Sequence, residues 1–351
     1  MDTLQKAFET ALVKYSQSHN LDEAKLRQFV EKVPDIVPDM VNEIADSVLR
    51  TLKEDAPAML RERQAYTAKF ERRTQKRWKP ALDLLEMFLV IAYEAGEEFN
   101  ETFREEASRQ SDKVFLALTM LHARGCQIGS EVLTLIKCGF ADAAHARWRT
   151  LHEIAVVAFV IAKHGQGVAE RYFLHEAIES YKAMRQYQEK CSVLNSEPYT
   201  EDEVKKTKRI YDDLLKRFGS SFKDNYGWAA AVLGQRKVSF SDLEADAGLA
   251  HLRPYYRMAS YNVHSSVKGV TFKLGLGLEK EPLLLAGPSN YGFADPAHGA
   301  AISLNQITVA LLNTRPSLDH LVVLTILNRL TEEIGQEFLR IQAELEEEVG
   351  S

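Results

Sequence analysis

The sequence predicts an all-α protein: a multi-helix bundle with a short β-hairpin or an irregular insertion near residues 270–298. Three observations support this fold class. The 18 glycines and 10 prolines make up about 8% of the 351 residues, whereas about 12% is usual in globular domains. No proline occurs between Pro80 and Pro198, and apolar residues recur every three or four positions along most of the chain. Long helices with few interruptions are the simplest interpretation.

The N-terminal part is expected to be helical and separate from the bundle. Apolar residues have helical spacing within residues 2–33, and Pro34 and Pro38 are expected to interrupt the helix there. Pro80 suits the first turn of a new helix, where its missing N–H costs nothing. We therefore expect two parts, an N-terminal helical extension with a basic segment and a main helical bundle domain: residues 1–80 and residues 81–351.

The apolar pattern of residues 109–163 predicts a helical pair at the centre of the bundle. Gly139 can end the first helix in a left-handed conformation, and Asp142 can start the second. The second helix, expected to end near Lys163, is almost entirely apolar in its second half. A helix that is apolar on all sides is buried, so we expect this one to be the central core helix.

The remaining third of the chain contains one irregular segment among helices. Six glycines and three prolines lie between Gly269 and Gly299, which indicates a long loop. Within it, residues 270–273 and 283–285 could pair as a small hairpin. Ser239 is expected to cap a helix at its N-terminus. Further helices are expected at residues 168–195, 201–218, 228–233, 255–267, 300–312 and 318–348.

The charge balance excludes a globally basic nucleic-acid-binding protein. The chain has 44 basic and 50 acidic residues, a formal net charge of −6. Two segments depart from this balance. Residues 61–79 carry eight basic groups against two acidic ones, and residues 332–348 carry seven acidic groups against one basic group. We expect these two segments to neutralise each other, within the fold or across a dimer.

Several function classes lack their sequence signals. The three cysteines form no CxxC pair, which argues against a disulfide framework or a zinc knuckle. Phosphate-binding, dinucleotide-binding, zincin and serine-hydrolase motifs are absent, and we predict no metal and no cofactor. The N-terminus has no signal-peptide pattern, and the longest apolar run is much shorter than the roughly 20 residues of a spanning helix. We therefore expect a cytoplasmic protein without a membrane segment.

The first candidate site is centred on Arg257 and His264. On a helix these residues would lie two turns apart on one face, beside a polar column of Tyr256, Ser260 and His264. A guanidinium can bind a phosphate bidentately, and an imidazole can transfer protons at neutral pH. Together they could cleave RNA without a metal, with Tyr256, Ser260 and Asn262 orienting them. The alternative is a buried polar network in which Tyr256 and Ser260 bond His264.

The second candidate site is on the predicted core helix. Arg149 and Glu153 are four residues apart, and a structural ion pair between them is the favoured interpretation because unpaired burial of charge is costly. His145 and His152 raise the question of a metal, but seven residues separate them, too many to share one ion without another helix. A contribution to a polar pocket that faces the helix of Arg257 is the remaining alternative.

The third candidate site is the basic segment of residues 61–79, which also contains Tyr66, Phe70 and Trp78. Basic groups with interleaved aromatic rings can follow a nucleic-acid backbone and stack bases. A solvated helix face, or docking onto the acidic C-terminal helix, are the alternatives. The nucleic-acid-binding candidates are Arg72, Arg73, Lys76 and Arg77.

Two stretches of the sequence together form a recognisable pattern. The residues that carry it are Glu131, Leu133, Leu135, Cys138, Gly139, Phe140, Ala143, Arg149, Leu151 and Glu153, then Tyr256, Ser260, His264 and Ser266. The combination resembles the uncharacterised bacterial family named domain of unknown function 5677, over roughly residues 85–330. The resemblance implies a helical fold without a settled activity. Its recurring polar residues would correspond to Arg149, Glu153, Tyr256, Ser260 and His264.

A looser similarity is to HEPN-type helical domains, which are dimeric RNases of toxin and defence systems with four to six residues between an arginine and a histidine. Arg257 and His264 meet the upper limit of this spacing. The residue after the arginine is usually polar in that superfamily, whereas Met258 is apolar. The polar role would then fall to Asn262 or Ser260.

Two functional hypotheses follow. The first is a HEPN-like, metal-independent ribonuclease of a stress or phage-defence system, with RNA as the partner, His264 as acid/base and Arg257 as phosphate ligand. A homodimer is expected because one Arg/His pair makes a sparse active site, and the irregular segment after His264 could be a lid. The alternative is a non-catalytic helical interaction or ligand-sensing protein in which Arg149, Glu153 and His264 form a structural network.

Overall fold

The computed structural model describes residues 23–264, 266–277 and 284–350, and five single positions before residue 18. Ten α-helices, α2 to α11, and three short 3-10 helices supply the regular structure of these residues, and none of them is in a β-strand. The prediction of an all-α fold is therefore confirmed for the described part of the chain. No helix in this part is both long and apolar enough to span a bilayer.

The chain divides into two units, residues 1–70 and residues 71–351. Helix α2 (Glu23–Gln110) contributes to both of them. The interruption expected at Pro34 and Pro38 and the helix start expected at Pro80 are wrong, because all three prolines lie within α2. A proline removes a single backbone hydrogen bond, and the cooperativity of a long helix carries the helix past that loss.

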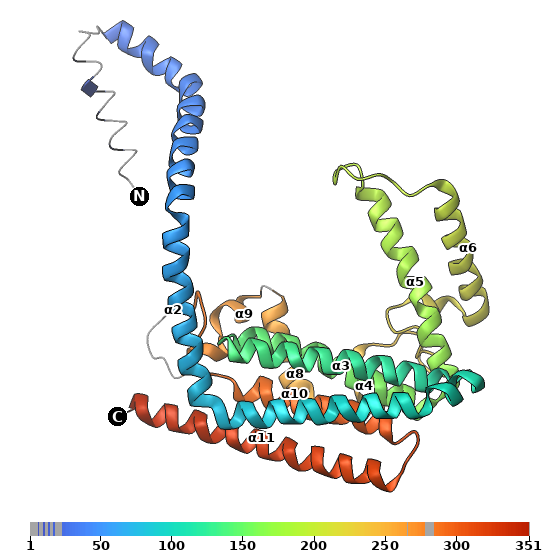
Figure 1. Cartoon of the computed structure of the whole chain (residues 1–351). Coiled ribbons are helices and arrows are strands. Elements are labelled where there is room, and N and C mark those ends of the chain that lie inside the picture. Colours follow the sequence, from blue (N-terminus) through green and yellow to red (C-terminus); the bar gives the residue numbers. More distant parts are fainter. Residues whose placement is uncertain are drawn as a thin grey trace. The chain divides into compact units, whose positions relative to one another are not determined.

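The core of the second unit is built on α4 (Ala141–His164). It packs against α3 (Lys113–Lys137) and α10 (Ala294–Leu312), and α10 packs in turn on α11 (Leu318–Gly350) (Figure 1). The second half of α4 is enclosed, and the prediction of a central core helix is confirmed. Its fully buried residues include Ala155, Val156, Ala158, Val160 and Ile161.

The ends of α4 form where the sequence predicts them. Gly139 has a φ of +87°, and its N–H donates to the Ile136 carbonyl at 2.9 Å while the N–H of Phe140 donates to Leu135 at 2.8 Å. This left-handed turn ends α3 and lets α4 begin at once. Gly165, with a φ of +75°, ends α4. Two glycines in positive-φ conformations thus delimit the core helix.

The breaker-rich segment is an irregular insertion. Residues 267–271 form the short helix α9 (Val267–Thr271), which Ser266 caps through a hydrogen bond from the N–H of Gly269 at 3.2 Å. The expected hairpin is therefore wrong at residues 270–273, where a local cap stabilises a helical turn. Leu283 lies outside the described residues, and residues 284–286 form no strand. The predicted alternative, an irregular insertion, agrees with the structure.

The insertion is attached to the start of α4. The Asp142 carboxylate accepts hydrogen bonds from the N–H groups of Leu274 at 3.0 Å and Gly275 at 3.3 Å, in the 3-10 turn η3 (Leu274–Leu276). The N–H of Ser289 donates to the carbonyl of Gly139 at 2.9 Å. The described part of the insertion therefore covers the beginning of the core helix.

Shorter helices complete the second unit. Helices α5 (Gln166–Lys190) and α6 (Glu201–Phe218) pair as a hairpin that extends away from the core layers (Figure 1). Residues 228–233, expected to be helical, form consecutive turns with bonds of the i to i+3 type. Two 3-10 helices follow, η1 (Ser220–Lys223) and η2 (Ala250–Leu252). Two short α-helices lie in the same part of the chain, α7 (Phe240–Asp246) and α8 (Arg253–Val263).

The second unit is closed by contacts between its first and last helices. The buried indole of Trp78 stacks on Phe338 of α11, with 5.6 Å between ring centroids, and meets Phe293 edge-on at 5.0 Å. Arg77 donates a hydrogen bond to Glu348 at 2.7 Å. The expected neutralisation between the basic and acidic segments is thus present within the chain at this pair.

Gly299 provides a test of the packing between α4 and α10. A Cβ at this position would lie 2.9 Å from Nε1 of Trp148, whose buried indole donates to Ser303 at 3.0 Å. We expect Gly299→Ala to lower the free energy of unfolding by about 1–3 kcal/mol, because a rigid, buried ring has to move. Urea unfolding of the full chain measures this change.

The matched control is Gly167→Ala near the start of α5, where a new Cβ has open space and the backbone φ is ordinary. It should leave stability unchanged or raise it by up to about 1 kcal/mol, as alanine favours helix more than glycine does. Equal stability of the Gly299→Ala chain and the wild type would contradict the close packing at Trp148.

Candidate functional site

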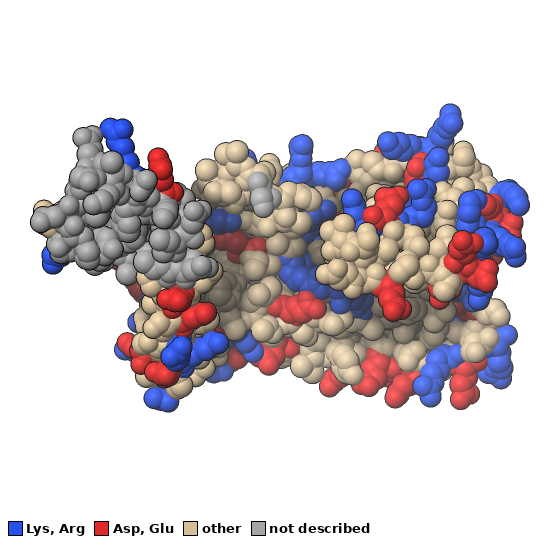
Figure 2. Space-filling model, turned by 90° about the horizontal axis from the view of Figure 1, so that it is seen from above, with Lys and Arg blue, Asp and Glu red and all other residues tan. Residues whose placement is uncertain are grey.

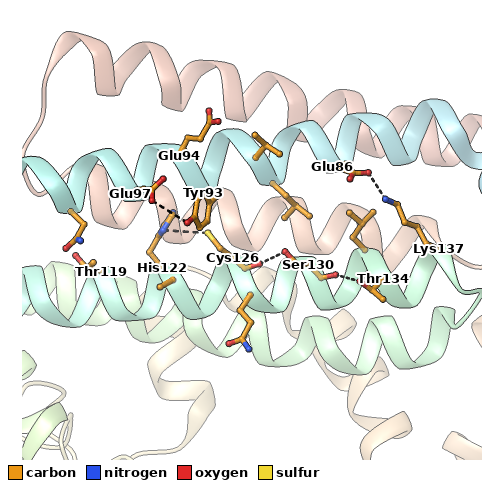
Figure 3. Close-up of a pocket in the computed structure, with 17 residues that line it drawn as sticks. Glu86, Tyr93, Glu94, Glu97, Thr119, His122, Cys126, Ser130, Thr134 and Lys137 are labelled. Atoms are coloured by element: carbon orange, nitrogen blue, oxygen red, sulfur yellow. Dashed lines mark hydrogen bonds and ion pairs between the residues drawn. The ribbon is translucent and has the colours of Figure 1, made fainter.

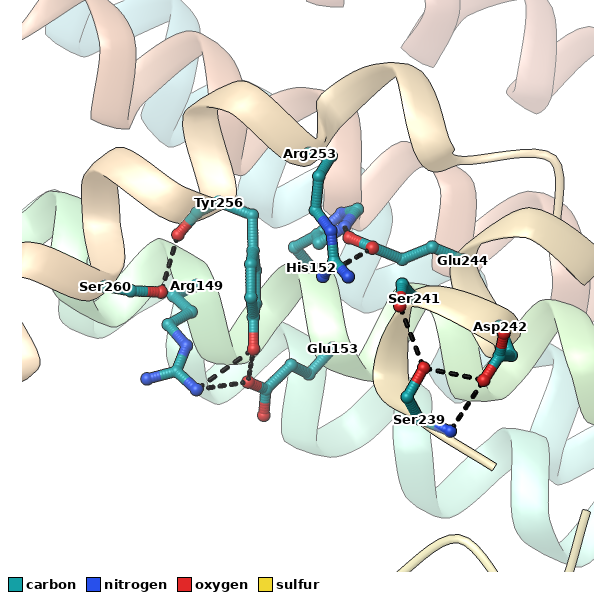
Figure 4. A network of polar contacts seen from close by, with 10 residues as sticks. All are labelled: Arg149, His152, Glu153, Ser239, Ser241, Asp242, Glu244, Arg253, Tyr256 and Ser260. Carbon is teal, nitrogen blue, oxygen red and sulfur yellow. Dashed lines mark hydrogen bonds and ion pairs between the residues drawn. The ribbon is translucent and has the colours of Figure 1, made fainter. Parts of the chain in front are cut away.

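A polar cluster lies where α8 packs on α4 (Figure 4). We call Arg149, Glu153 and Tyr256 the α4–α8 cluster. Arg149 and Glu153 are one turn apart on α4, and Tyr256 reaches them from the first half of α8. Pro254 lies in the first turn of α8, where its fixed φ and missing N–H favour a helix start. The orientation of α8 is thus set locally, and its buried tyrosine faces the core helix.

The cluster is a closed triangle of contacts. The Tyr256 hydroxyl donates to Glu153 Oε1 at 2.6 Å and accepts from Arg149 Nη2 at 3.0 Å. The same Arg149 nitrogen lies 3.2 Å from Glu153 Oε1, so the predicted ion pair is present. The guanidinium also lies over the Tyr256 ring, 4.9 Å from its centroid. Each of the three side chains therefore contacts both of the others.

The electrostatics favour a neutral tyrosine within this triangle. Burial, together with the hydrogen bond to Glu153, raises the pKa of Tyr256 well above its ordinary range. The phenol keeps its proton at every physiological pH and can act as a donor to the carboxylate. Because the charges of Arg149 and Glu153 neutralise each other and the phenol bridges them, the cluster joins the two helices.

A second polar cluster lies beside the first and ties α7 to the same two helices. His152 Nε2 is 2.9 Å from Glu244 Oε1, and Arg253 Nη1 is 2.8 Å from Glu244 Oε2. His152 and Glu244 are fully buried. Burial raises the pKa of Glu244 and lowers the pKa of His152 to about 4.

Sequence reasoning identified neither Glu244 nor Arg253 as site residues. The signal that could have indicated Glu244 is its place in a short capped helix, next to the buried Leu243. Asp242 accepts from the N–H of Ser239 at 2.8 Å, so the predicted cap is confirmed and α7 is held in register. An acid adjacent to a buried leucine on such a short helix has few directions open other than the core.

Arg257 and His264 do not join these clusters. Both side chains are exposed, and neither forms a hydrogen bond or ion pair with the residues that the structure describes. Helix α8 ends at Val263, and His264 follows it with an extended backbone. The N–H of His264 still donates to the Ser260 carbonyl at 3.1 Å, so His264 closes the last turn of α8, and the helix expected over residues 255–267 ends before Ser266.

The expected hydrogen bonds of Tyr256 and Ser260 to the His264 side chain are not found among the described residues. Tyr256 is turned into the α4–α8 cluster, whereas the Ser260 hydroxyl donates back to the carbonyl of Tyr256 at 2.7 Å. Asn262 accepts from Lys273 at 3.4 Å, which links α8 to the insertion. His264 is absent from the network with Arg149 and Glu153 that the non-catalytic hypothesis included.

The basic segment is only partly available to a nucleic acid. Arg72, Arg73 and Lys76 are exposed on α2, but Arg77 is paired with Glu348. Trp78 is buried and donates its indole N–H to Asn290 at 2.8 Å, so this ring cannot stack on a base. On the face drawn in Figure 2, basic and acidic side chains of the described residues are interspersed.

A groove of about 830 Å³ lies between α2 and α3 (Figure 3). Leu89 and Leu133 contribute apolar surface to the groove, and Glu94 and Glu97 line it with acidic side chains from α2. His122 is buried at its base, where Nε2 lies 3.1 Å from the Thr308 hydroxyl. Among the described residues no group of three or more His, Cys, Asp or Glu side chains could hold a metal ion.

The comparisons with known proteins give one match. Residues 115–281 match the model of a family of unknown function, DUF5677, and the resemblance expected from the sequence is confirmed over this span. No curated protein and no solved structure matches the chain. The matched span covers just under half of the chain and includes both polar clusters.

The bridging hydroxyl of Tyr256 can be removed without changing the ring. We expect Tyr256→Phe to lower the free energy of unfolding by about 1–3 kcal/mol, because Glu153 loses a buried donor and Arg149 an acceptor. The neighbouring Tyr255 is half-exposed, with no hydroxyl hydrogen bond to a described residue, and Tyr255→Phe is the matched control. Urea unfolding of the two variants should separate them, and equal stabilities would show that the triangle contributes nothing.

Three buried histidines, His122, His145 and His152, predict acid sensitivity. Burial lowers the pKa of each of them to about 4, from an ordinary 6.5. Between these values the unfolded chain binds protons that the folded chain does not. Stability should therefore fall as the pH decreases from 7 to 5, by about 1–2 kcal/mol for each histidine. Glu244, whose pKa is raised, acts in the opposite direction because the folded chain takes up that proton first.

Urea unfolding at pH 7, 6 and 5 measures this slope. His145→Gln should flatten it, because the amide takes up no proton in either state. A stability that stays constant or rises toward pH 5 would contradict the assignment of neutral, buried imidazoles.

Proposed function

We propose that this chain, whose residues 115–281 match a family of unknown function, is a non-catalytic helical interaction protein. The observation that carries the proposal is an apolar stripe along α2 in the first unit. We call it the α2 stripe, and its six members are Val41, Val48, Leu49, Leu52, Met59 and Tyr66. Each of these side chains is 48–62% exposed in the single chain.

Exposure of such a stripe favours a binding role. Six large apolar side chains follow one another at intervals that keep them on one side of the helix. Contiguous apolar surface of this kind on a helix is typical of interaction sites, because a partner that covers it removes apolar area from water. A partner that covers the α2 stripe would therefore account for the apolar side chains exposed on the first unit.

The polar clusters of the second unit support a structural role for its charged residues. Arg149 Nη2, Glu153 Oε1 and the Tyr256 hydroxyl bond one another, and Glu244 is shared by His152 and Arg253. A side chain whose donors and acceptors are used between helices is poorly placed to bind a substrate. In this proposal the clusters hold α7 and α8 on the core helix.

RNA cleavage by Arg257 and His264 is the second candidate. It is favoured by the exposure of both side chains and by the absence of described partners that would occupy them. In this alternative His264 moves a proton at the 2′-hydroxyl or at the leaving oxygen, and Arg257 binds the phosphate.

One assay separates the two candidates. Single-stranded RNA is incubated with the full chain in the presence of EDTA, using the wild type, Arg257→Ala and His264→Ala. We expect the three proteins to give the same background, because a non-catalytic protein has no activity to lose. His251→Ala, which changes another exposed histidine before α8, is the matched control.

Cleavage by the wild type and by His251→Ala that is lost in His264→Ala would overturn the non-catalytic function and support the second candidate. Cleavage that survives in His264→Ala would be assigned to a contaminant, since the proposed acid/base group is then absent.

A further inference from the structure

We propose that residues 41–70 of α2 pair with the same residues of a second copy of this chain, as an antiparallel two-helix coiled coil. The inference rests on the proposed function and names its partner. The segment is about 45 Å long at 1.5 Å per residue, long enough for a stable helix pair. Both its apolar pattern and its charge pattern point to the same arrangement.

The apolar pattern has the width of a helix–helix seam. At 100° per residue, the six members of the α2 stripe fall within about 100° of the helix circumference. Ala45 and Ala56 fall on the same side, and each provides a small residue against which a large one can pack. Arg63 also lies on this side, where its guanidinium covers the ring of Tyr66 at 5.8 Å from the centroid. Its aliphatic stem adds apolar surface to the seam.

The charge pattern favours a second copy of this chain as the partner, and it favours two helices that run in opposite directions. Residues 41–55 carry four acidic and two basic groups, whereas residues 56–70 carry three basic groups and one acidic group. The two halves are thus opposite in sign and equal in magnitude. An antiparallel pair places each acidic half on a basic half, whereas a parallel pair places like on like. A segment with two complementary halves is self-complementary about a two-fold axis near residues 55 and 56.

This axis defines which residues face each other. Leu52 of one copy lies opposite Met59 of the other, and the small Ala45 lies opposite the large Tyr66. Val48 lies opposite Arg63 of the partner copy. In a parallel pair each residue would instead lie beside its own equivalent.

The mass of the full chain in solution tests the pairing. Light scattering after size exclusion should give about twice the chain mass of 39.7 kDa for the wild type. A chain with both Leu49→Glu and Leu52→Glu places charge in the seam and should be monomeric. Ser47→Glu adds charge on the far side of the same helix and should remain dimeric.

The direction is tested by disulfide formation between two single-cysteine variants, Val48→Cys and Arg63→Cys. In the antiparallel pair, a mixture of the two chains should cross-link, whereas each chain alone should not, because equivalent residues are about 22 Å apart along the axis. The wild type is the control for its own cysteines, of which Cys126 and Cys191 are buried.

The outcomes separate this inference from the proposed function. Cross-linking of Val48→Cys with itself would indicate a parallel pair and overturn the antiparallel assignment. A monomeric wild type, or a dimer that survives Leu49→Glu with Leu52→Glu, would overturn the pairing of the α2 stripe. The interaction function would still stand in these cases, because only RNA cleavage that depends on His264 overturns it.

Discussion

The enclosure of α4 is the constraint on which the rest of the second unit depends. On a helix surrounded by α3, α8 and α10, a polar side chain without a partner is costly, because the interior is apolar; His145, whose two ring nitrogens have no described partner, is neutral there. Arg149 and Glu153 pair with each other on this helix, and the further partners of Arg149, His152 and Glu153 come from elsewhere in the chain. Helices α7 and α8 supply them, with Glu244 and Tyr256, and their places against the core follow from that requirement.

This constraint also divides the molecule into regions with different roles. Of the residues that the family resemblance emphasises, Arg149, Glu153 and Tyr256 are used between helices, whereas the side chain of His264, just beyond α8, has no described partner, and neither has that of Arg257. The apolar surface that calls for a partner lies elsewhere, in the first unit. A motif read along the sequence therefore combines residues that hold the core together with residues that have no part in it.

Local signals predicted the core well and the site only in part. Gly139 and Gly165 mark the ends of α4 because a positive φ is a local property of glycine, and the apolar run between them predicts burial. Partners such as Glu244 could not be found in this way, since ninety-two positions separate it from His152 and only the packing of α7 brings them together. The helix expected to continue to residue 267 ends at Val263 instead, and Ser266 caps a separate short helix after it. The prolines within α2 show a different error: the local rule that a proline interrupts a helix was overridden by the cooperativity of a long helix.

The contact between the two ends of the second unit has a consequence for the order in which the protein matures. Trp78, near the start of this unit, finds its stacking partner only in Phe338 of the last helix, and Arg77 finds Glu348 almost at the end of the chain. On the ribosome, the first helix is made long before these partners emerge. The indole surface thus stays open until α11 has been made, and this part of the core closes only after the other helices of the second unit have been synthesised.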